Sequence, residues 1–398
     1  MEFYHDILEN LLDKLIDYRG KTPKKTLSGV PLVTAKIVKN GTINGYTEYI
    51  AEEDYDKWMV RGFPKVGDVI LTTEAPLGEV ALLKEEKVAL AQRIVCLRGK
   101  DNVLDNTYLK YYLQSGKGQK SLSARESGTT VTGIKQAELR RVDIEYPAYD
   151  DQRRIASILS SLDRKIELNN KINADLEEMA QAIFKNWFVD FEPFKDGKFV
   201  DSELGMIPEG WKVGTLGDIT KNKSAKVKER NDVKVLSPVT TGELVLSEEY
   251  FTKQVFSSSI AKYKIVNKGD FAYNPARVNI GSLGRNEFDF DGCVSPVYVV
   301  FSVLDGYENY FDLFRKTDFF KDSVASLAIG GVRQSLSYDD LSLIETIIPS
   351  ENVVEKFNNL YNQMKKTIKA NKLENSRLSL LRDTLLPRLM SGELEVPE

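Results

Sequence analysis

The chain contains very few of the residues from which metal centres and nucleophilic sites are usually built. Among its 398 residues, His5 is the only histidine, and Cys96 and Cys293 are the only cysteines. A single histidine, which we expect on a polar amino-terminal helix, excludes a Ser-His-Asp or Cys-His pair and a histidine-based metal site. Two scattered cysteines do not make a disulfide framework or a zinc site, and they favour a reducing compartment.

Membrane and secretion signals are also missing. No run approaches the ~18 consecutive apolar residues of a membrane helix. The amino terminus, MEFYHDILEN, carries acids where a secretory signal carries Lys or Arg, so we expect a cytoplasmic protein. The net charge of −4 is not that of a general nucleic-acid binder. The local charge on a contacting face decides such binding, however, so this class stays open.

Motifs for catalysis are scarce as well. No Gly-rich loop ends in Gly-Lys-Ser/Thr, as a nucleotide site requires. Asn274 and Pro275 begin like the Asn-Pro-Pro-aromatic motif of amino-methyltransferases, but Ala276 and Arg277 follow where a proline and an aromatic residue would grip a flipped base. No acidic triad with a lysine, of the kind found in nucleases, recurs in both halves of the chain. We therefore expect no catalytic residue and no metal in this chain.

What the sequence does contain is a repeat of two copies at an offset of 202 residues, a register that we expect to hold throughout. Four pairs illustrate it: Gly67 and Gly269, Gly128 and Gly330, Leu139 and Leu341, Pro147 and Pro349. Such a repeat indicates duplication of a whole module, a globular part followed by a long helix, with the copies related by a pseudo-twofold. A hydrophobic content of 42% is enough for two cores.

Hydrophobic patterning predicts an α/β fold with short strands and turns in each globular part. We expect strands at 69–72, 80–83, 271–273 and 297–301, with turns at Gly67-Asp68 and Gly269-Asp270, and short amphipathic helices at 108–113 and 310–314. The predicted division is a first globular domain at 1–150, a first long helix at 151–190, a linker at 191–206, a second globular domain at 207–350, and a second long helix with a tail at 351–398. Asp150, Asp151 and Ser350 are the predicted helix N-caps.

Both long helices carry an apolar seam with a spacing of four and three residues, which is typical of a coiled coil. The central seam residues are Leu162, Ile166, Asn169, Asn173 and Leu176 in the first helix and Met364, Ile368, Asn371, Asn375 and Leu378 in the second. Arg382 is an outlier further along. If the helices pack antiparallel, Asn169 meets Asn375 and Asn173 meets Asn371, which would fix the register. Alternatively, these asparagines lie beside the seam in water.

Positive charge gathers near the start of each copy. The basic residues are Arg19, Lys21, Lys24 and Lys25 in the first copy and Lys221, Lys223, Lys226, Lys228 and Arg230 in the second. They are either solvated loops or contacts for an anionic partner. Both copies also contain a glycine loop, 127–134 and 329–336, in which Thr129, Thr130, Arg333 and Gln334 offer hydrogen-bond donors.

Four strings of the sequence carry a resemblance to a known family. They are QRRIASILSSLDRKIELNN at 152–170, FKNWFVDFEPF at 184–194, LGMIPEGWKVGTLGDI at 204–219 and LLPRLMSGELEV at 385–396. In these strings and in its layout, nearly the whole chain resembles the specificity subunits of type I restriction-modification systems.

The resemblance implies a non-catalytic DNA-binding subunit with two target-recognition domains, each reading one part of a bipartite DNA sequence. The long helices would act as a spacer and as a docking surface for DNA adenine methyltransferase subunits, two of them if the pseudo-twofold is used. S-adenosylmethionine, ATP and Mg²⁺ would belong to those methyltransferase and to restriction/translocase partners. The alternatives are a structural coiled-coil adaptor without DNA affinity and a self-sufficient enzyme with an unfamiliar site.

Under this reading, the basic residues neutralise phosphates and a smaller group of side chains reads base edges. Arg can bind guanine with two hydrogen bonds, and Asn or Gln can bind adenine in the same way. The candidates for base contacts are Lys21, Lys36, Gln92, Arg93, Thr129 and Thr130 in the first domain and Asn274, Arg277, Arg285, Arg333 and Gln334 in the second. For each of them the competing role is a surface salt bridge or a loop hydrogen bond.

Overall fold

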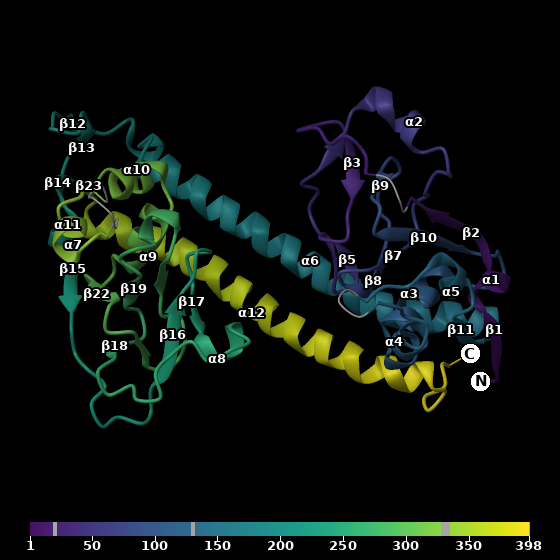
Figure 1. Cartoon of the computed structure of the whole chain (residues 1–398). Coiled ribbons are helices and arrows are strands. Elements are labelled where there is room, and N and C mark those ends of the chain that lie inside the picture. Colours follow the sequence, from purple (N-terminus) through teal and green to yellow (C-terminus); the bar gives the residue numbers. More distant parts are fainter. Residues whose placement is uncertain (19–21, 129–131, 328–334, 398) are drawn as a thin grey trace. The chain divides into compact units, whose positions relative to one another are not determined.

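The computed structural model of the chain describes residues 1–18, 22–128, 132–327 and 335–397 (Figure 1). The chain divides into two units, unit 1 with Met1–Asn170 and Asn371–Glu398, and unit 2 with Lys171–Ala370. Two long helices, α6 (Tyr149–Phe188) and α12 (Glu351–Met390), each contribute one half to each unit. The remainder of each unit is a body of short strands and helices, called body 1 and body 2 below.

Body 1 is built on a four-stranded antiparallel sheet in the order β2-β10-β7-β8. A three-stranded sheet, β6-β3-β9, lies beside it and contains a parallel pair, β3 with β9. The strands are β1 (Phe3–Ile7), β2 (Leu12–Asp17), β3 (Val30–Val33), β4 (Val38–Lys39), β5 (Thr42–Ile43), β6 (Tyr49–Ile50), β7 (Val69–Thr73), β8 (Leu77–Leu82), β9 (Ala89–Leu90), β10 (Ile94–Gly99) and β11 (Asp143–Pro147). The helices are α1 (Leu8–Leu11), η1 (Glu52–Asp54), α2 (Tyr55–Trp58), α3 (Asn106–Gln114), α4 (Gly116–Ser123) and α5 (Gln136–Arg140).

Body 2 has the same plan, with a four-stranded antiparallel sheet β15-β22-β19-β20 and a second sheet β17-β16-β21-β18 that contains the parallel pair β16 with β21. The strands of unit 2 are β12 (Phe199–Val200), β13 (Ile207–Pro208), β14 (Lys212–Thr215), β15 (Thr220–Lys223), β16 (Lys234–Pro238), β17 (Leu244–Leu246), β18 (Lys264–Val266), β19 (Phe271–Tyr273), β20 (Leu283–Arg285), β21 (Gly292–Val294), β22 (Val299–Val303) and β23 (Glu345–Ile348). Its short helices are η2 (Glu192–Phe194), α7 (Leu216–Ile219), α8 (Ser247–Tyr250), η3 (Val278–Ile280), α9 (Glu308–Phe314), α10 (Asp318–Leu327) and α11 (Tyr338–Ser342).

The central sheet of each body is buried on both faces, because alternate residues of a strand point to opposite sides. On β10, Val95 and Leu97 belong to the core that faces α3 and α6, whereas Cys96 belongs to the core under the three-stranded sheet. On β22, Phe301 and Val300 divide between two cores in the same way. These runs are therefore apolar throughout rather than alternating.

Most elements predicted from the sequence are confirmed, including the strands β7, β8, β19 and β22 and the helices α3 and α9. The predicted amino-terminal helix is wrong: His5 lies in β1, opposite Glu145 of β11. Pairing with β11, a strand far away in the sequence, stabilises this polar segment as an edge strand. The predicted N-caps Asp150 and Asp151 are also wrong, because α6 begins at Tyr149 and both acids lie inside its first turn, where they favour the helix dipole.

The expectation that the 202-residue offset never slips is wrong as well. Leu8 N donates to Val142 O at 2.8 Å, and Leu216 N donates to Ile344 O at 2.9 Å. The acceptors are 202 residues apart, but the donors are 208 apart. The segment from the start of β2 to the start of β7 is six residues longer than the segment from β15 to β19. Connections at the surface absorb this difference, while α6 and α12 begin and end at the same offset of 202.

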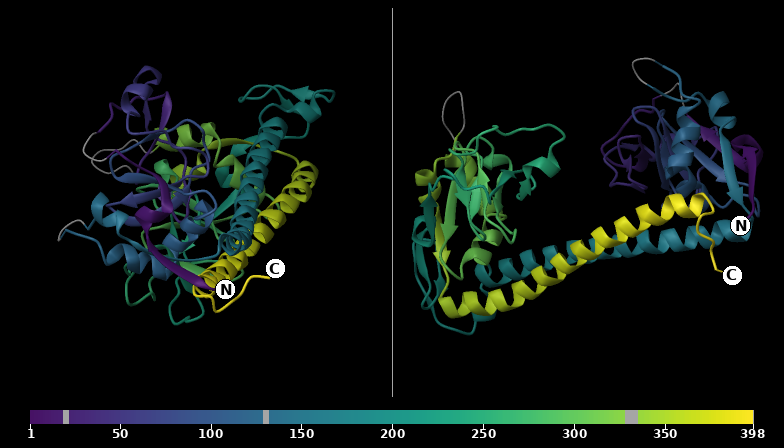
Figure 2. Two further views of the ribbon diagram at one scale, coloured as in Figure 1. Left: turned by 90° about the vertical axis from the view of Figure 1, so that its right-hand side faces the viewer. Right: turned by 90° about the horizontal axis from the view of Figure 1, so that it is seen from below.

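The two long helices pack antiparallel, as predicted, and lie side by side within each unit (Figures 1 and 2). In unit 1, Asn169 Nδ2 donates to Asn375 Oδ1 at 2.9 Å and to a Glu374 carboxylate oxygen at 2.8 Å. Asn169 is 1% exposed, so these amides form a polar contact inside the apolar seam that specifies one register. All ten central seam residues are buried or half-buried. No helix within the described ranges is long and apolar enough to cross a membrane.

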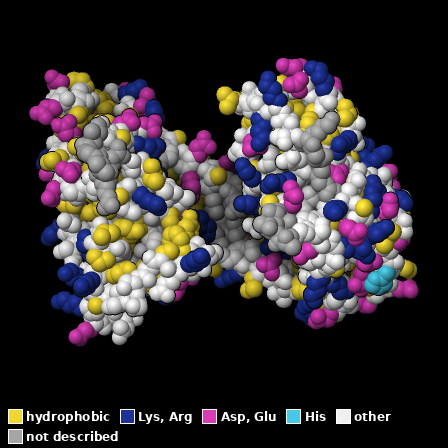
Figure 3. All heavy atoms as spheres, in the orientation of Figure 1, with side chains coloured by type: hydrophobic (Ala, Val, Ile, Leu, Met, Phe, Trp, Pro, Cys, Tyr) yellow, Lys and Arg dark blue, Asp and Glu magenta, His cyan; other side chains and the backbone are white. Residues whose placement is uncertain are grey.

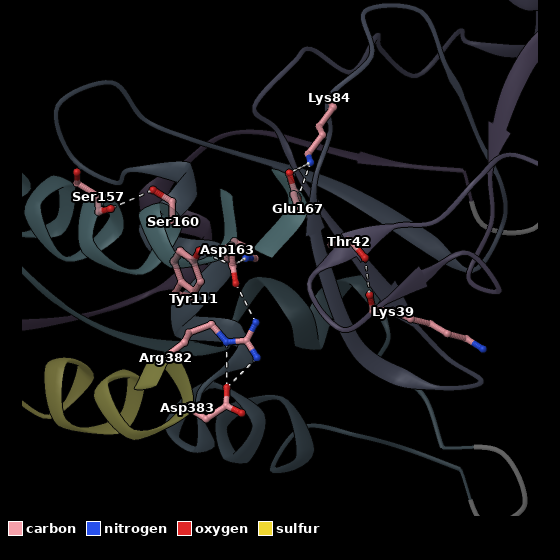
Figure 4. Close-up of polar contacts among 11 residues, drawn as sticks. Lys39, Thr42, Lys84, Tyr111, Ser157, Ser160, Asp163, Glu167, Arg382 and Asp383 are labelled. Atoms are coloured by element: carbon pink, nitrogen blue, oxygen red, sulfur yellow. Dashed lines mark hydrogen bonds and ion pairs between the residues drawn. The ribbon is translucent and has the colours of Figure 1, made fainter. Parts of the chain in front are cut away.

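Arg382, the outlier of the seam, is explained by a half-buried carboxylate on the facing helix. Asp163 accepts hydrogen bonds from Arg382 Nη1 at 2.8 Å, Lys110 Nζ at 2.9 Å and Tyr111 OH at 2.6 Å (Figure 4). Burial alone would raise the pKa of Asp163, but the charge of Lys110 and these hydrogen bonds outweigh burial and lower it. Burial lowers the pKa of Lys110, although Asp163 acts to raise it. The ion pair of Lys110 with Asp163 therefore contributes only modestly to the stability of the fold.

We predict that Asp163→Asn lowers the free energy of unfolding of unit 1 by about 2 kcal/mol at pH 7. The pKa of Asp163 is lower in the folded state than in the unfolded state. Its ionised carboxylate therefore contributes fully to the free energy of unfolding above the unfolded pKa of about 3.9, and this contribution is lost as the pH falls through the folded pKa. The difference between wild type and variant should therefore shrink below about pH 4. Urea unfolding across this range checks it, with Glu177→Gln, an exposed position on α6, as the control.

Candidate nucleic-acid interface

In body 1, segments that are far apart in the sequence meet at the end of β7. Thr73 N donates to Arg93 O at 2.9 Å, and Ile134 N donates to Thr73 O at 3.0 Å. Ser127 and Gly133 exchange two backbone hydrogen bonds of 2.8 and 3.0 Å, which close the glycine loop between them. The end of β7 therefore holds both the segment of Gln92 and Arg93 and the base of the glycine loop. We call this arrangement the loop clamp of body 1.

The basic segment of the first copy reaches the same place. Thr22, which follows Lys21 directly, donates from Oγ1 to Gln92 Oε1 at 3.3 Å. Arg93 Nε lies 2.9 Å from Glu74 Oε1, and both side chains are half-exposed, at 49% and 42%. Exposed pairs of this kind contribute only about 0 to 1 kcal/mol. A phosphate or a base edge could therefore compete with Glu74 for Arg93.

Body 2 repeats one part of this arrangement beyond the end of β19, the contact that holds the end of the glycine loop, and we call it the loop clamp of body 2. Leu336 N donates to Pro275 O at 3.1 Å, and these two residues are each 202 positions beyond Ile134 and Thr73. Tyr273 OH donates to Leu336 O at 3.2 Å and adds a buried contact. Asn274, beside this clamp, accepts from Ala276 N at 3.1 Å in a turn that leads to the exposed Arg277. Each body thus ties the end of its glycine loop to the end of an equivalent central strand.

Comparisons with known proteins relate the chain to proteins that specify DNA targets of restriction enzymes. Residues 13–178 match the family described as the type I restriction modification DNA specificity domain. The type I restriction enzyme MjaIX specificity subunit of Methanocaldococcus jannaschii is 29% identical over 399 residues, which cover 95% of this chain and 91% of that protein. The type I restriction enzyme HindI specificity subunit of Haemophilus influenzae is 26% identical over 357 residues, covering 69% of this chain and 74% of that protein. Residues 13–178 thus belong to the type I restriction modification DNA specificity domain family, and nearly the whole chain is similar to a type I restriction enzyme specificity subunit.

The fold of the chain is similar to that of a solved type I S subunit. The crystal structure of the type I restriction-modification S subunit from M. genitalium matches with a TM-score of 0.60 and 17% identity, covering 100% of this chain and 97% of that one. The similarity extends over both bodies and both long helices. Two α/β bodies and two long antiparallel helices, predicted from the repeat, are therefore the observed fold.

Several predicted contact residues are engaged by partners inside their own body. Lys223 Nζ lies 2.8 Å from both oxygens of Asp270. Arg285 Nη1 donates to Asn309 Oδ1 at 2.9 Å and lies over the ring of Phe271. Lysine and arginine side chains are interspersed with acids on the face shown in Figure 3, in keeping with the low net charge. Local pairing thus decides which cations are available to a ligand.

Lys226 and Lys228 differ from Lys223, because the structure turns them toward solvent. Val227 N donates to Tyr263 O at 2.9 Å, and the Val227 side chain is 2% exposed. Its two lysine neighbours are exposed, and no ion pair to either is found among the residues that the structure describes. Exposed positions are also occupied by Lys24, Lys25, Lys36 and Lys221, of which Lys25 pairs with Glu48 at 2.7 Å.

Six of the predicted contact residues lie outside the described residues. They are Arg19, Lys21, Thr129, Thr130, Arg333 and Gln334. The sequence reasoning missed Glu74, the partner of Arg93, and the closing pair Ser127 and Gly133. A sequence signal for Glu74 exists: it follows β7 by one residue, at the edge from which the loop clamp is built.

The turns that enter β7 and β19 are confirmed, and they show how the two copies diverged. Gly67 and Gly269 have φ of +87° and +90°, which favours glycine. Asp68 binds Arg98 of β10 with two hydrogen bonds of 2.7 Å, whereas Asp270 binds Lys223 of β15. The carboxylate is retained in both copies, but its cation comes from a different strand. These acids therefore hold the sheet rather than a ligand.

Proposed function

We propose that the chain is the non-catalytic subunit that selects the DNA target of a type I restriction-modification complex, with each body reading one part of a bipartite sequence. The observation that carries the proposal is the backbone hydrogen bond that ties the end of the glycine loop to the end of a central strand, which both loop clamps contain. In body 1 it brings together Gln92, Arg93 and Thr22, and in body 2 it lies beside Asn274 and Arg277. Two equivalent readers in one chain suit a target with two defined parts.

The proposed mechanism divides the work between two kinds of contact. Exposed lysines such as Lys226 and Lys228 neutralise phosphates, which gives salt-dependent affinity and no sequence preference. Side chains at the loop clamps approach base edges, where a good bidentate contact discriminates by about 1 to 3 kcal/mol. Arg93 and Arg277 suit guanine, whereas Gln92 and Asn274 suit adenine.

We further propose that the reactions belong to partner subunits in the cytoplasm. Methylation of adenine with S-adenosylmethionine would be performed by DNA adenine methyltransferase subunits, and the pseudo-twofold favours two of them. ATP and Mg²⁺ would serve restriction/translocase subunits. Among the residues that the structure describes, no group of three or more His, Cys, Asp and Glu is placed to hold a metal ion. In this proposal the chain itself supplies recognition and docking surfaces.

A base-resolution map of methylated adenines tests the proposed function. The DNA would come from cells that produce this chain together with the methyltransferase encoded beside it, and from cells that produce the methyltransferase alone. We expect a split motif, two short defined blocks around a fixed run of unspecified bases, only when this chain is present. Absence of methylation by a folded methyltransferase that binds this chain would contradict the proposal and favour a structural adaptor.

The phosphate contacts give a second prediction. Lys226→Ala with Lys228→Ala should weaken binding to all DNA sequences alike and reduce the slope of log K against log salt concentration by about 1.8, because each lost phosphate contact removes about 0.9. Titration of labelled duplex at several salt concentrations measures this slope. Lys212→Ala, at an exposed position on β14, is the matched control. An unchanged slope in the double variant would exclude these lysines from the DNA interface.

A further inference from the structure

The junction between body 1 and its helix is held by two lysines of the body and two acids of the helix. Lys110 Nζ of α3 lies 2.9 Å from Asp163 Oδ2 of α6. Lys84 Nζ, beyond the end of β8, lies 2.6 Å from Glu167 Oε1, one turn further along α6 (Figure 4). Lys110 is only 5% exposed, so its charge depends on the acid that faces it. At this junction the body is positive and the helix is negative.

The junction between body 2 and its helix has the opposite polarity. Lys365 of α12 pairs with Glu287, beyond the end of β20, and lies 3.9 Å from Asp312 Oδ2 of α9. Lys369, one turn further along α12, lies 3.0 Å from Asp289 Oδ2. Asp312 is only 4% exposed, and although its burial acts in the opposite direction, Arg315 and Lys365 lower its pKa to about 2. Here the body is negative and the helix is positive.

These are equivalent positions of the repeat rather than unrelated salt bridges. Asp163 and Lys365, Glu167 and Lys369, and Lys110 and Asp312 are each 202 residues apart. The remaining pair follows from backbone hydrogen bonds: Leu83 N donates to Asp68 O, and Asn286 N donates to Asp270 O, which makes the next residues, Lys84 and Glu287, equivalent. At these four positions the charge of the second copy is the reverse of the first, whereas Asp289, the partner of Lys369, has an acid, Glu86, at the corresponding place in body 1.

We infer that the reversed charges are a key that fits each body to its own helix and excludes it from the other. A body 2 placed on α6 would set Asp312 against Asp163, and a body 1 placed on α12 would set Lys110 against Lys365. Like charges in such half-buried sites repel and leave both groups without a partner. Discrimination is a difference between two affinities, so a key of this kind works even though each native pair stabilises its junction only modestly.

The key allows each body to pack on only one of the two long helices. It acts within each unit and does not depend on DNA, so it goes beyond the proposed function and can be tested without it. The seam does not supply this distinction, because it is similar in the two helices, with asparagine pairs at the same positions. The charges at the four junction positions distinguish one helix from the other.

Point variants of the full chain can give one junction the charges of the other. The first variant, Lys84→Glu with Lys110→Asp, gives body 1 the charges of body 2. The second, Asp163→Lys with Glu167→Lys, gives α6 the charges of α12. The second variant also carries Arg382→Ala, because Arg382 would repel the introduced lysine and its equivalent in the second copy is Ala180. A third variant combines all five substitutions.

Amide hydrogen exchange in α3 and in the unit 1 half of α6 is the measurement, with α9 as an internal reference. The first two variants should each raise exchange by at least about tenfold, and the combined variant should return to within about threefold of wild type. Lys120→Glu with Glu177→Lys, at exposed positions, is the control and should change nothing at this junction. A combined variant that exchanges as fast as the product of the two separate effects would overturn the inference.

If the substitutions at the less exposed positions prevent folding, the more exposed pair still tests the inference. Lys84 and Glu167 are 61% and 42% exposed, so Lys84→Glu, Glu167→Lys and their combination should all fold. We expect Lys84→Glu to raise exchange at the junction on the native helix and to lower it on the Glu167→Lys background. The same effect on both backgrounds would mean that the two positions are not coupled, and the key would be refuted.

Discussion

A chain in which residues 1–147 are replaced by the equivalent body of another family member is expected to direct methylation to a target of which only one part is new. The cores of body 1 are completed by residues of unit 1, including Ile155 and Leu159 of α6 and Leu389 and Met390 of α12. Among the residues that the structure describes, none of body 2 takes part in these cores. Body 1 can therefore be exchanged without disturbing the loop clamp of body 2. A map of methylated adenines gives the result directly.

The donor body must suit the helix that receives it. A donor with basic residues at the positions of Lys84 and Lys110 should fold on α6, because Asp163 and Glu167 remain in place. A donor with acids there should give little folded protein, and this serves as the matched control. Independent recognition by the two bodies would be wrong if both parts of the methylated sequence changed together.

Phe357→Ala is expected to cause the largest loss of stability of any single change considered, about 3 to 5 kcal/mol, which is typical when a buried phenylalanine is truncated. Phe357 is 1% exposed and lies where α12 meets α6 in unit 2. Its ring centroid is 5.0 Å from that of Phe188, 6.0 Å from that of Trp187 and 6.2 Å from that of Phe184. Truncation leaves a cavity among rings that cannot all move to fill it.

Urea unfolding followed by tryptophan fluorescence measures this loss, because Trp187 is in contact with the substituted side chain. Leu360→Ala is the control: Leu360 is on the same helix but is 37% exposed, so its truncation should cost clearly less. Equal losses in the two variants would show that the aromatic cluster does not stabilise unit 2 more than the exposed face of α12 does.

The sequence was sufficient to predict the architecture, because its signals are periodic. The repeat predicted two bodies and two long helices, and the seam predicted the contact of Asn169 with Asn375. The slip of six residues could not be predicted, because it is absorbed in surface connections that carry no hydrophobic period. His5 was misplaced because its strand is stabilised by β11, a partner that is remote in the sequence.

The contact residues were less predictable for a related reason. A lysine or an arginine has the same appearance in a sequence whether it faces solvent or a carboxylate. Lys223 and Lys226 belong to one basic run, yet the first is bound to Asp270 and the second is exposed. Lys223 lies on β15 and Lys226 lies on the segment after it. The course of these two segments determines which lysine faces a carboxylate and which faces solvent. The reversed junction charges were present in the sequence, but they have meaning only once α3 and α9 are known to contact the long helices.

The two loop clamps have a consequence for how the family changes its targets. Backbone hydrogen bonds of Ser127, Gly133 and Ile134 hold the ends of the glycine loop in body 1. The number of residues between these ends should therefore have little effect on the free energy of unfolding of the body. Doubling the length of a flexible loop costs only about 0.6 kcal/mol in closure entropy. Mutation can therefore lengthen, shorten or rewrite this segment at a small cost in stability, and under the proposed function new DNA preferences would then arise on an unchanged scaffold.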